Sequence, residues 1–256
     1  MENIADKYLK GLIEGGRRSD GRKLDEFREI EVKVGVMKNA EGSALVKIGD
    51  TKVIAGIKME IVEPFKDTPE EGVLKVNAEF SPLASPEFEI GPPSEDAIEL
   101  ARVVDRGIRE SRAIELERLC LEPKLRVWGV FIDIDILNHC GNLLDASALA
   151  SIAALLNTKI PKLENGEIVR GKFEKALQVA FKPITITVCK VGNNFLLDPS
   201  YEEEEIVETK LSFGIRDDDK ICAIQKYGSK ELEFSDIEAA LDLAVVKSKE
   251  LRKLLG

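Results

Sequence analysis

The chain of 256 residues has one histidine, one tryptophan and four cysteines. Cys120, Cys140, Cys189 and Cys222 lie far apart without a CxxC pair, so we expect reduced thiols in a cytoplasmic chain without a leader peptide. A single histidine, His139, excludes most Ser-His-Asp and Cys-His schemes and leaves few ligand sets for zinc. No apolar run approaches the ~18 residues that span a membrane, so we expect no membrane contact.

Positive charge is outnumbered by negative charge. The chain has 37 Lys and Arg against 47 Asp and Glu, for a net charge of −10. Because binding of nucleic-acid phosphates depends on Lys and Arg, this balance argues against a protein that coats nucleic acid by itself. An acidic chain can still share a nucleic-acid site with a basic partner. The length is enough for a sizeable core, in one large domain or two fused halves.

A strand, a glycine turn and a helix follow one another between residues 129 and 156. Isoleucines 132, 134 and 136 alternate with Asp133 and Asp135, which is strand periodicity. The turn at Gly141 precedes apolar residues at helical spacing, namely Leu144, Ala148, Ile152 and Leu155. Such a turn often cradles phosphate, because the first N–H groups of a helix lack partners.

Similar patterns predict the remaining elements. Alternation predicts strands over residues 30–36, 43–47, 51–58 and 73–80, with a hairpin at Gly49-Asp50. Ser94 caps a predicted helix that runs to about residue 119, with a buried face of Ile98, Ala101, Val104, Ile108 and Leu116. A strand over 125–137 leads into the glycine turn, and residues 169–176 are interpreted as a connector.

A second set of strands is predicted over residues 184–191, 195–197, 206–215 and 221–226, followed by a helix with a capping box of Ser235 and Glu238. An amphipathic helix over residues 1–16 buries Ile4, Tyr8, Leu12 and Ile13. We therefore expect an α+β fold over residues 1–256, made of two pseudo-repeated halves of approximately 17–122 and 123–256, after the helix 1–16.

Two groups of arginines are candidate binding residues. Arg102, Arg106, Arg109 and Arg112 form a stripe that is either a solvated face paired with nearby acids or the lining of a channel or subunit interface. Arg18 and Arg22 flank the turn Ser19-Asp20-Gly21. That turn is either solvated, with Asp20 capping backbone amides, or it forms a buried Arg–Asp clamp or an RNA-facing patch.

The acidic groups have two interpretations as well. Asp133 and Asp135 share a strand face and are candidates for Mg²⁺, but we expect them to face solvent or a partner's cations. The run Glu202–Glu205 is expected to be a solvated turn rather than a metal site. His139 is expected to be structural, since no second base or nucleophile lies near it in sequence. We expect no metal and no cofactor.

Many stretches occur in the order found in the RNase PH family, which the chain resembles over nearly its full length. They are the Arg18–Arg22 turn, GSALVKIGDTKVIAGIK, the Glu99 helix with its arginines and LLDPSYEEEE. The chain is similar to non-catalytic RNase PH-like subunits of the archaeal exosome in AIELARVVDRGIRES, VWGVFIDIDIL, GNLLDASALASIAALLNTK and KICAIQKYGS.

This resemblance implies an RNase PH-like fold (a ribosomal-protein-like βαβ topology) that acts in phosphorolytic 3′→5′ degradation of single-stranded RNA. The family implies a six-membered ring. In the archaeal exosome, three heterodimers of a catalytic and a non-catalytic subunit alternate, and RNA-binding cap subunits lie on one face. Catalytic members use inorganic phosphate and release nucleoside diphosphate.

The sequence departs from that of catalytic members at the positions where bound phosphate requires cations and backbone hydrogen-bond donors. Asn142, Leu143 and Leu144 stand where catalytic members have a Gly-Thr-Arg-like turn, and Glu95-Asp96 stands where they have an Arg-Arg pair. A charge pair ~5 Å apart at an effective dielectric of ~20 contributes roughly 3 kcal/mol, so reversing one sign changes the energy by about 6 kcal/mol. We therefore predict that phosphate does not bind.

A further departure is in the acidic segment. Glu204 and Lys210 align with two aspartates that serve catalytic members as general acid and divalent-metal ligand. We expect a non-catalytic exosome subunit that structures the active site of the adjacent catalytic subunit and helps guide RNA. One alternative is an active phosphate-dependent exoribonuclease that forms a homohexamer. Another is a metal-dependent enzyme that uses Asp133, Asp135 and the acidic run.

Overall fold

The alternating apolar residues of the first part of the chain pair into a six-stranded sheet with the order β1-β2-β3-β6-β4, and with β5 on β6. The computed structural model describes residues 4–256. β4 runs parallel to β6, and the other neighbours are antiparallel. The strands are β1 (Ile30–Val34), β2 (Gly42–Ile48), β3 (Thr51–Val62), β4 (Val73–Phe80), β5 (Cys120–Glu122) and β6 (Arg126–Asn138).

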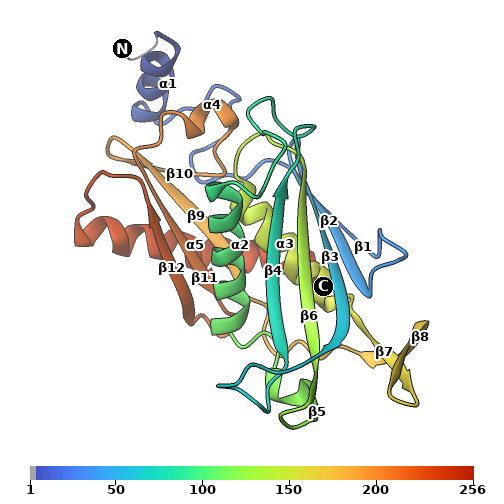
Figure 1. The fold of residues 1–256 in the computed structure, drawn as a ribbon. Coiled ribbons are helices and arrows are strands. Elements are labelled where there is room, and N and C mark those ends of the chain that lie inside the picture. The colour runs from blue at the N-terminus through green and yellow to red at the C-terminus, as the bar shows by residue number, and fades with distance from the viewer. Residues whose placement is uncertain (1–3) are drawn as a thin grey trace.

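A second sheet has four antiparallel strands in the order β10-β9-β11-β12. They are β9 (Ile184–Val191), β10 (Asn194–Leu197), β11 (Thr209–Ile215) and β12 (Ile221–Tyr227). A separate hairpin of β7 (Lys159–Glu164) and β8 (Glu167–Ala176) projects from the body beside β3 (Figure 1), where Arg170 donates to the Met59 carbonyl at 3.4 Å. The mixed α+β class predicted from the sequence is confirmed.

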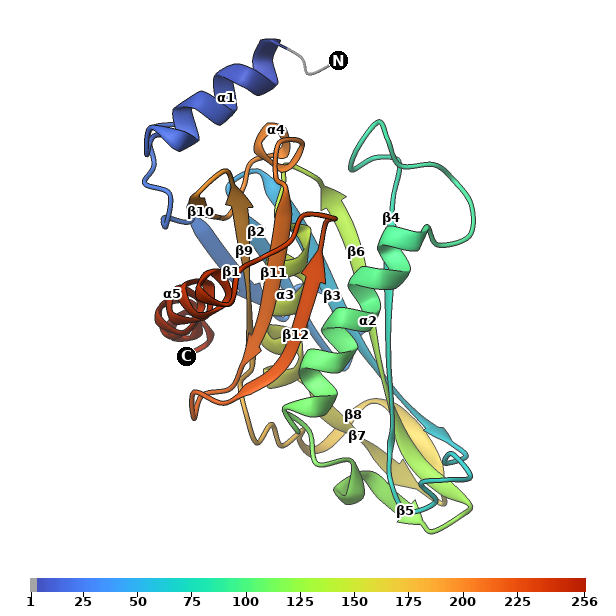
Figure 2. The same cartoon turned by 90° about the vertical axis from the view of Figure 1, so that its left-hand side faces the viewer.

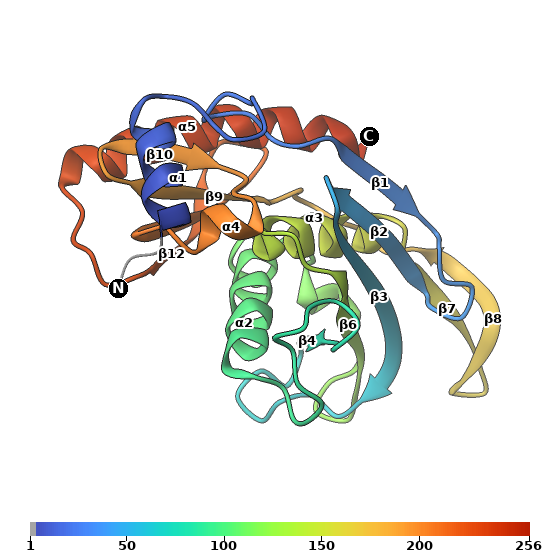
Figure 3. The same cartoon turned by 90° about the horizontal axis from the view of Figure 1, so that it is seen from above.

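Helix α3 (Leu143–Leu156) lies between the two sheets (Figure 3). Its small residues allow this close approach, since Ala146, Ala150 and Ala154 are each fully buried. The helix is apolar all round because sheets pack on both of its sides, as expected for a helix at the centre of a core. α2 (Glu95–Glu110) packs against β4 and β12, and α5 (Phe234–Arg252) covers the outer face of the second sheet (Figure 2).

The first helix is less buried than its pattern predicted. α1 (Ile4–Glu14) inserts Ile13 into a small cluster with Cys189, Val191, Leu196 and Ile206. Ile4 and Tyr8, expected on the buried face, are 86% and 65% exposed. Residues 1–3 of the predicted helix lie outside the described part of the chain.

α2 ends nine residues before the predicted position near Leu119. The Ser111 hydroxyl donates to the Ile108 carbonyl at 2.9 Å, and Arg112 adopts a positive φ of 54°, so the helix cannot continue. Leu116 belongs to a short 3₁₀ helix, η1 (Leu116–Leu119). The prediction that Ile98 is buried is wrong, because its side chain is 47% exposed.

Three local predictions differ from the structure. Residues 169–176 belong to strand β8 and are not an irregular connector. Helix α5 starts with a capping box of Glu233 and Asp236, so Ser235 and Glu238 lie inside the helix. Ile206 lies in a turn before β11 rather than in the strand. A short 3₁₀ helix η2 (Lys253–Leu255) ends the chain.

β6 belongs to the first sheet, although it follows the expected boundary near residue 122 between the two halves. It pairs with β3 and β4 along most of its length, so its side chains alternate between the core and the open sheet face. Among residues 4–256, no helix is long and apolar enough to cross a membrane.

Candidate functional site

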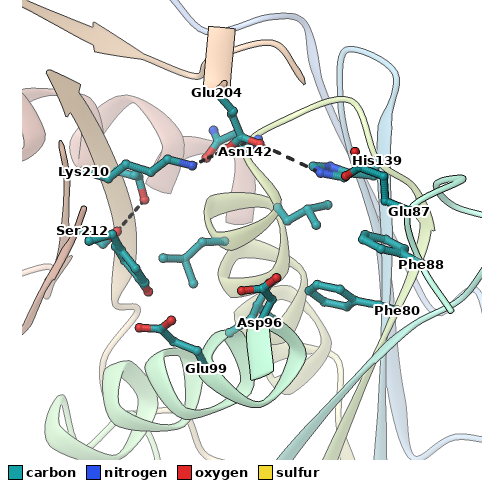
Figure 4. Close-up of a pocket in the computed structure, with 15 residues that line it drawn as sticks. Phe80, Glu87, Phe88, Asp96, Glu99, His139, Asn142, Glu204, Lys210 and Ser212 are labelled. Atoms are coloured by element: carbon teal, nitrogen blue, oxygen red, sulfur yellow. Dashed lines mark hydrogen bonds and ion pairs between the residues drawn. The ribbon is translucent and has the colours of Figure 1, made fainter. Parts of the chain in front are cut away.

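A pocket of about 330 Å³ opens at the first turn of α3, between the ends of the two sheets (Figure 4). It collects side chains from β4, α2, α3, the short helix α4 (Tyr201–Glu204) and β11. Most of the expected departures from the catalytic pattern meet here: Asp96, Asn142, Leu143, Leu144, Glu204 and Lys210. Glu95 lies outside this lining and borders a neighbouring groove on α2.

The turn before α3 has a backbone that few residues can adopt. Asn142 has a φ of 56° and Gly141 a φ of 91°. A Cβ atom on Gly141 would lie 2.3 Å from the carbonyl oxygen of Pro199, so only glycine fits. The Asn142 side chain donates to Oδ1 of Asp198 at 3.0 Å, which ties this turn to the segment before α4.

The carboxylate of Glu204 sits at the N-terminal end of α3. Its Oε1 accepts from the backbone N–H of Asn142 at 3.2 Å and from Nζ of Lys210 at 3.0 Å. Burial acts to lower the pKa of Lys210, but the charge and hydrogen bond of Glu204, together with smaller effects of Cys189 and Asp145, outweigh burial and raise the pKa. A helix N-terminus stabilises negative charge, so this side chain takes a place suited to an anion.

His139 packs beside this ion pair as a neutral ring. It stacks on Phe88 with ring centroids 5.6 Å apart and meets the edge of Tyr201 at 5.1 Å. The Gly141 N–H donates to Nδ1 at 3.3 Å, so Nε2 carries the proton of the neutral ring, 4.0 Å from Oε2 of Glu204. Burial lowers the pKa of His139, although Glu204 acts in the opposite direction.

Below the pocket, Asp145 is buried in a hydrogen-bonded network. It accepts from the backbone N–H of Thr187 at 3.1 Å and from the Thr187 hydroxyl at 2.7 Å. Thr187 also contacts the Ser212 hydroxyl at 2.8 Å. Burial raises the pKa of Asp145 to about 7, against the lowering effect of the Thr187 hydrogen bonds. This network fixes α3 to β9 and β11.

The pocket carries a negative balance. Its lining contains four carboxylates, from Glu87, Asp96, Glu99 and Glu204, against one ammonium from Lys210. That ammonium is already paired with Glu204. Phosphate is an anion and needs cations or free backbone donors, so the lining is unfavourable for it.

The Arg18–Arg22 turn forms part of a buried clamp. The Arg18 side chain is 0% exposed, pairs with Glu203 and donates to the Leu197 and Asp198 carbonyl oxygens at 2.9 and 2.8 Å. Arg22 contacts Oδ2 of Asp198 at 3.0 Å. Asp20 accepts from the Arg22 backbone N–H at 3.1 Å, as the capping interpretation predicted, and pairs with the Arg22 side chain at the surface. The acids of the buried clamp are Glu203 and Asp198. Burial removes Arg18 from the candidate RNA contacts in this chain.

The arginine stripe lines a groove of about 390 Å³ between α2 and β4. Arg109 pairs with Asp105 at 2.8 Å and donates to the Leu74 carbonyl at 3.0 Å. Arg106 donates to Gln225 at 3.2 Å, and the exposed Arg102 has no ion pair with any described residue. Arg112 lies beyond the helix end and does not line this groove.

The carboxylates proposed as a metal site are not brought together. Asp133 and Asp135 lie on the open face of the first sheet, where Asn77 donates to Asp133 at 3.1 Å. Burial raises the pKa of Asp135, with the nearby Glu79 and Asp133 adding to the shift. In the acidic run, Glu203 is 1% exposed instead of solvated. No group of three or more His, Cys, Asp or Glu within residues 4–256 could hold a metal ion.

Several site residues were not found from the sequence. Arg28 donates through Nε and Nη2 to the Asp198 carboxylate at 2.8 and 2.7 Å, and Phe80, Phe88 and Tyr227 line the pocket. Asp198 lies in the apolar stretch LLDP, and its position there could have predicted a buried ion pair with an arginine, because buried carboxylates need cationic partners. The aromatic residues gave no such signal, since their elements meet only in the folded chain.

Two sheets that enclose a central helix, with a pocket at its first turn, define an RNase PH-like fold. The chain belongs to the 3′ exoribonuclease family RNase PH: residues 26–161 match its domain 1 and residues 183–247 match its domain 2. This confirms the family resemblance predicted from the sequence.

Relatives match over the full length. The chain is 45% identical to the exosome complex component Rrp42 of Thermococcus gammatolerans, covering 100% of this chain and 95% of the relative. It is 47% identical to the Rrp42 component of Methanothermobacter thermautotrophicus, with 100% and 95% covered.

Solved structures of related proteins have the same fold. A chain of the Archaeoglobus fulgidus exosome with RNA bound to the active site superposes with a TM-score of 0.93 at 47% identity, covering 99% of this chain and 98% of that one. Rice Rrp46, at 16% identity and a TM-score of 0.70 with 93% and 98% covered, shares the fold.

Proposed function

We propose that this chain is a non-catalytic RNase PH-like subunit of a cytoplasmic exosome ring. In this role it structures the active site of an adjacent catalytic RNase PH-like subunit and contributes to the path of single-stranded RNA in 3′→5′ phosphorolysis. Relatives named exosome complex component Rrp42 support the assembly. The observation that carries the non-catalytic part is the Glu204 carboxylate at the N-terminus of α3.

Phosphorolysis requires an inorganic phosphate beside an anionic RNA backbone, so the site must supply positive charge. In this pocket Lys210 and the Asn142 N–H already bind the Glu204 carboxylate. At ~4 Å and an effective dielectric of ~20, each further like charge opposes phosphate by about 4 kcal/mol before screening. Asp96 and Glu99 add such charges on the opposite wall (Figure 4).

The chain's contribution to RNA binding is assigned to the arginine stripe. Arg102 and Arg106 are exposed on α2, and neither has an ion pair among the described residues. An acidic chain gains affinity for RNA only where such cations gather and where a basic partner shares the path. The ring that we propose contains three heterodimers with the catalytic subunit, and RNA-binding cap subunits lie on one face.

Native mass spectrometry of the full chain with a catalytic RNase PH-like subunit from the same source tests the assembly. We expect a heterodimer mass and a hexamer mass of three heterodimers. A homohexamer of this chain alone, with no complex on mixing, would contradict the proposed role and favour an independent exoribonuclease.

A further inference from the structure

The pocket at the start of α3 keeps an open volume of about 330 Å³ beside the Glu204–Lys210 pair, at the lower end of the usual range for small-molecule sites. One wall is apolar. Phe80 and Phe88 lie with ring centroids 4.7 Å apart, and Leu143 and Leu144 extend this wall. The pocket therefore has space and apolar surface for an organic group.

The opposite wall offers hydrogen-bond acceptors. Asp96 and Glu99 project from α2 into the pocket (Figure 4). Asp96 is exposed and has no cationic partner among residues 4–256, and Glu99 accepts only a 3.4 Å contact from Gln225. Their charges are not neutralised inside the chain.

Ser212 gives an independent indication of the ligand's polarity. It is 1% exposed and lines the pocket. A threonine hydroxyl has one hydrogen, and Thr187 donates it to Asp145 when that carboxylate is ionised, as it is at pH 8. The 2.8 Å contact between the two hydroxyls is then donated by Ser212 to Thr187. The Ser212 oxygen keeps acceptor capacity that no donor within residues 4–256 uses. This acceptor favours a hydrogen-bond donor in the pocket.

We propose that this pocket binds an aliphatic diamine or polyamine, with an ammonium group between Asp96, Glu99 and Ser212. The methylene chain lies along Phe80, Phe88 and the two leucines. Ammonium groups are donors only, and aromatic faces attract cations, so both walls favour the same ligand class. This site is independent of the proposed ring, because every residue that forms it belongs to this chain.

Mg²⁺ fits the same pocket less well. It requires a nearly octahedral set of oxygen ligands and gains nothing from an apolar wall. A neighbouring subunit's lysine or arginine presents similar chemistry, and this occupant is distinguished by measuring both the lone chain and its complex.

Calorimetric titration of the full-length chain with spermidine at pH 8 and fixed ionic strength tests the proposal. We expect 1:1 binding, weakened at least about tenfold by Asp96→Asn or by Glu99→Gln and severalfold by Ser212→Ala. Glu89→Gln removes an exposed acid from the adjacent loop outside the pocket and should change the affinity less than twofold. Methylammonium, which lacks the chain, should bind at least about tenfold more weakly.

The same titration on the chain bound to its catalytic partner should show the same site. Equal affinity of the wild type and both acidic variants would overturn the proposal. The proposal would also fail if Mg²⁺, at the same total concentration of positive charge, occupied the site as well as spermidine does. It would fail as well if spermidine binding disappeared in the complex because a neighbouring side chain fills the pocket.

Discussion

The Nζ atom of Lys210 lies 3.0 Å from Oε1 of Glu204, at the first turn of the helix that the two sheets enclose. The two residues are six positions apart in sequence, on α4 and β11. Their contact places an internal carboxylate at the N-terminal end of α3, a position that suits an anion. The proposed absence of phosphorolysis rests on this ion pair.

Removing this carboxylate should expose an anion site. In Glu204→Ala, Lys210 and the Asn142 N–H lose their acceptor, so we expect inorganic phosphate to raise the melting temperature of the variant but not that of the wild type. The double variant Glu204→Ala/Lys210→Met should lose this response. A wild-type chain stabilised by phosphate as strongly as the variant would contradict the account.

Asp145 should make stability depend on pH. Its folded-state pKa of about 7 lies above the ordinary value of 3.8, so its stabilising contribution is fully present below about pH 4 and is lost as the pH rises through 7. The free energy of unfolding relative to Asp145→Asn should therefore fall over this window, by at most about 4 kcal/mol. Urea denaturation at pH 5 and pH 8 measures it.

The control for this pH dependence is Asp242→Asn, which changes an exposed acid on α5. Its difference from the wild type should stay within about 0.5 kcal/mol at both pH values. If the difference between wild type and Asp145→Asn stayed constant between pH 5 and pH 8, the raised pKa of Asp145 would be disproved.

The Arg18–Glu203 pair should be important for stability. Both side chains are buried, at 0% and 1% exposure, so Arg18→Met leaves an uncompensated carboxylate and should cost about 3–5 kcal/mol. Arg17→Met, at an exposed neighbouring position, should change stability by less than about 0.5 kcal/mol. Denaturant unfolding should also show that Arg18→Met/Glu203→Gln recovers part of the loss. No recovery would mean that the cost does not come from the unpaired charge.

Arg102 and Arg106 should contribute to RNA affinity in the assembled ring. Replacing both with Ala should weaken binding of single-stranded RNA and reduce the slope of log affinity against log salt by about 1.4, because each phosphate contact accounts for about 0.7. Arg118→Ala changes an exposed arginine in η1 and serves as the matched control. An unchanged slope in the double variant would remove α2 from the RNA path.

Local patterns predicted the bounds of several strands. β4 and β9 have the bounds that the sequence predicted, and β6 keeps the predicted alternation at Asp133 and Asp135. β8 was missed because most of its residues are exposed, so no apolar period marks it. The proposed duplication of the two halves stays a prediction.

The site was predicted in part. The departures at Asn142, Leu143, Leu144, Glu204 and Lys210 came from the family resemblance, and the structure places all of them around one pocket. Sequence spacing could not show that Glu204 accepts from the Asn142 N–H, because these residues are 62 positions apart. Burial of Glu203 was missed for a similar reason, since its partner Arg18 is 185 positions away.

Phosphate-dependent release of nucleoside diphosphate from poly(A) tests the central claim most directly. The full chain alone, its catalytic partner alone and the mixed complex should be measured at equal molar concentration of each subunit. We predict no release by this chain alone, and release by the complex that exceeds that of the partner alone. Phosphate-dependent release by this chain alone, lost in a Glu204→Ala variant that still folds, would contradict the account.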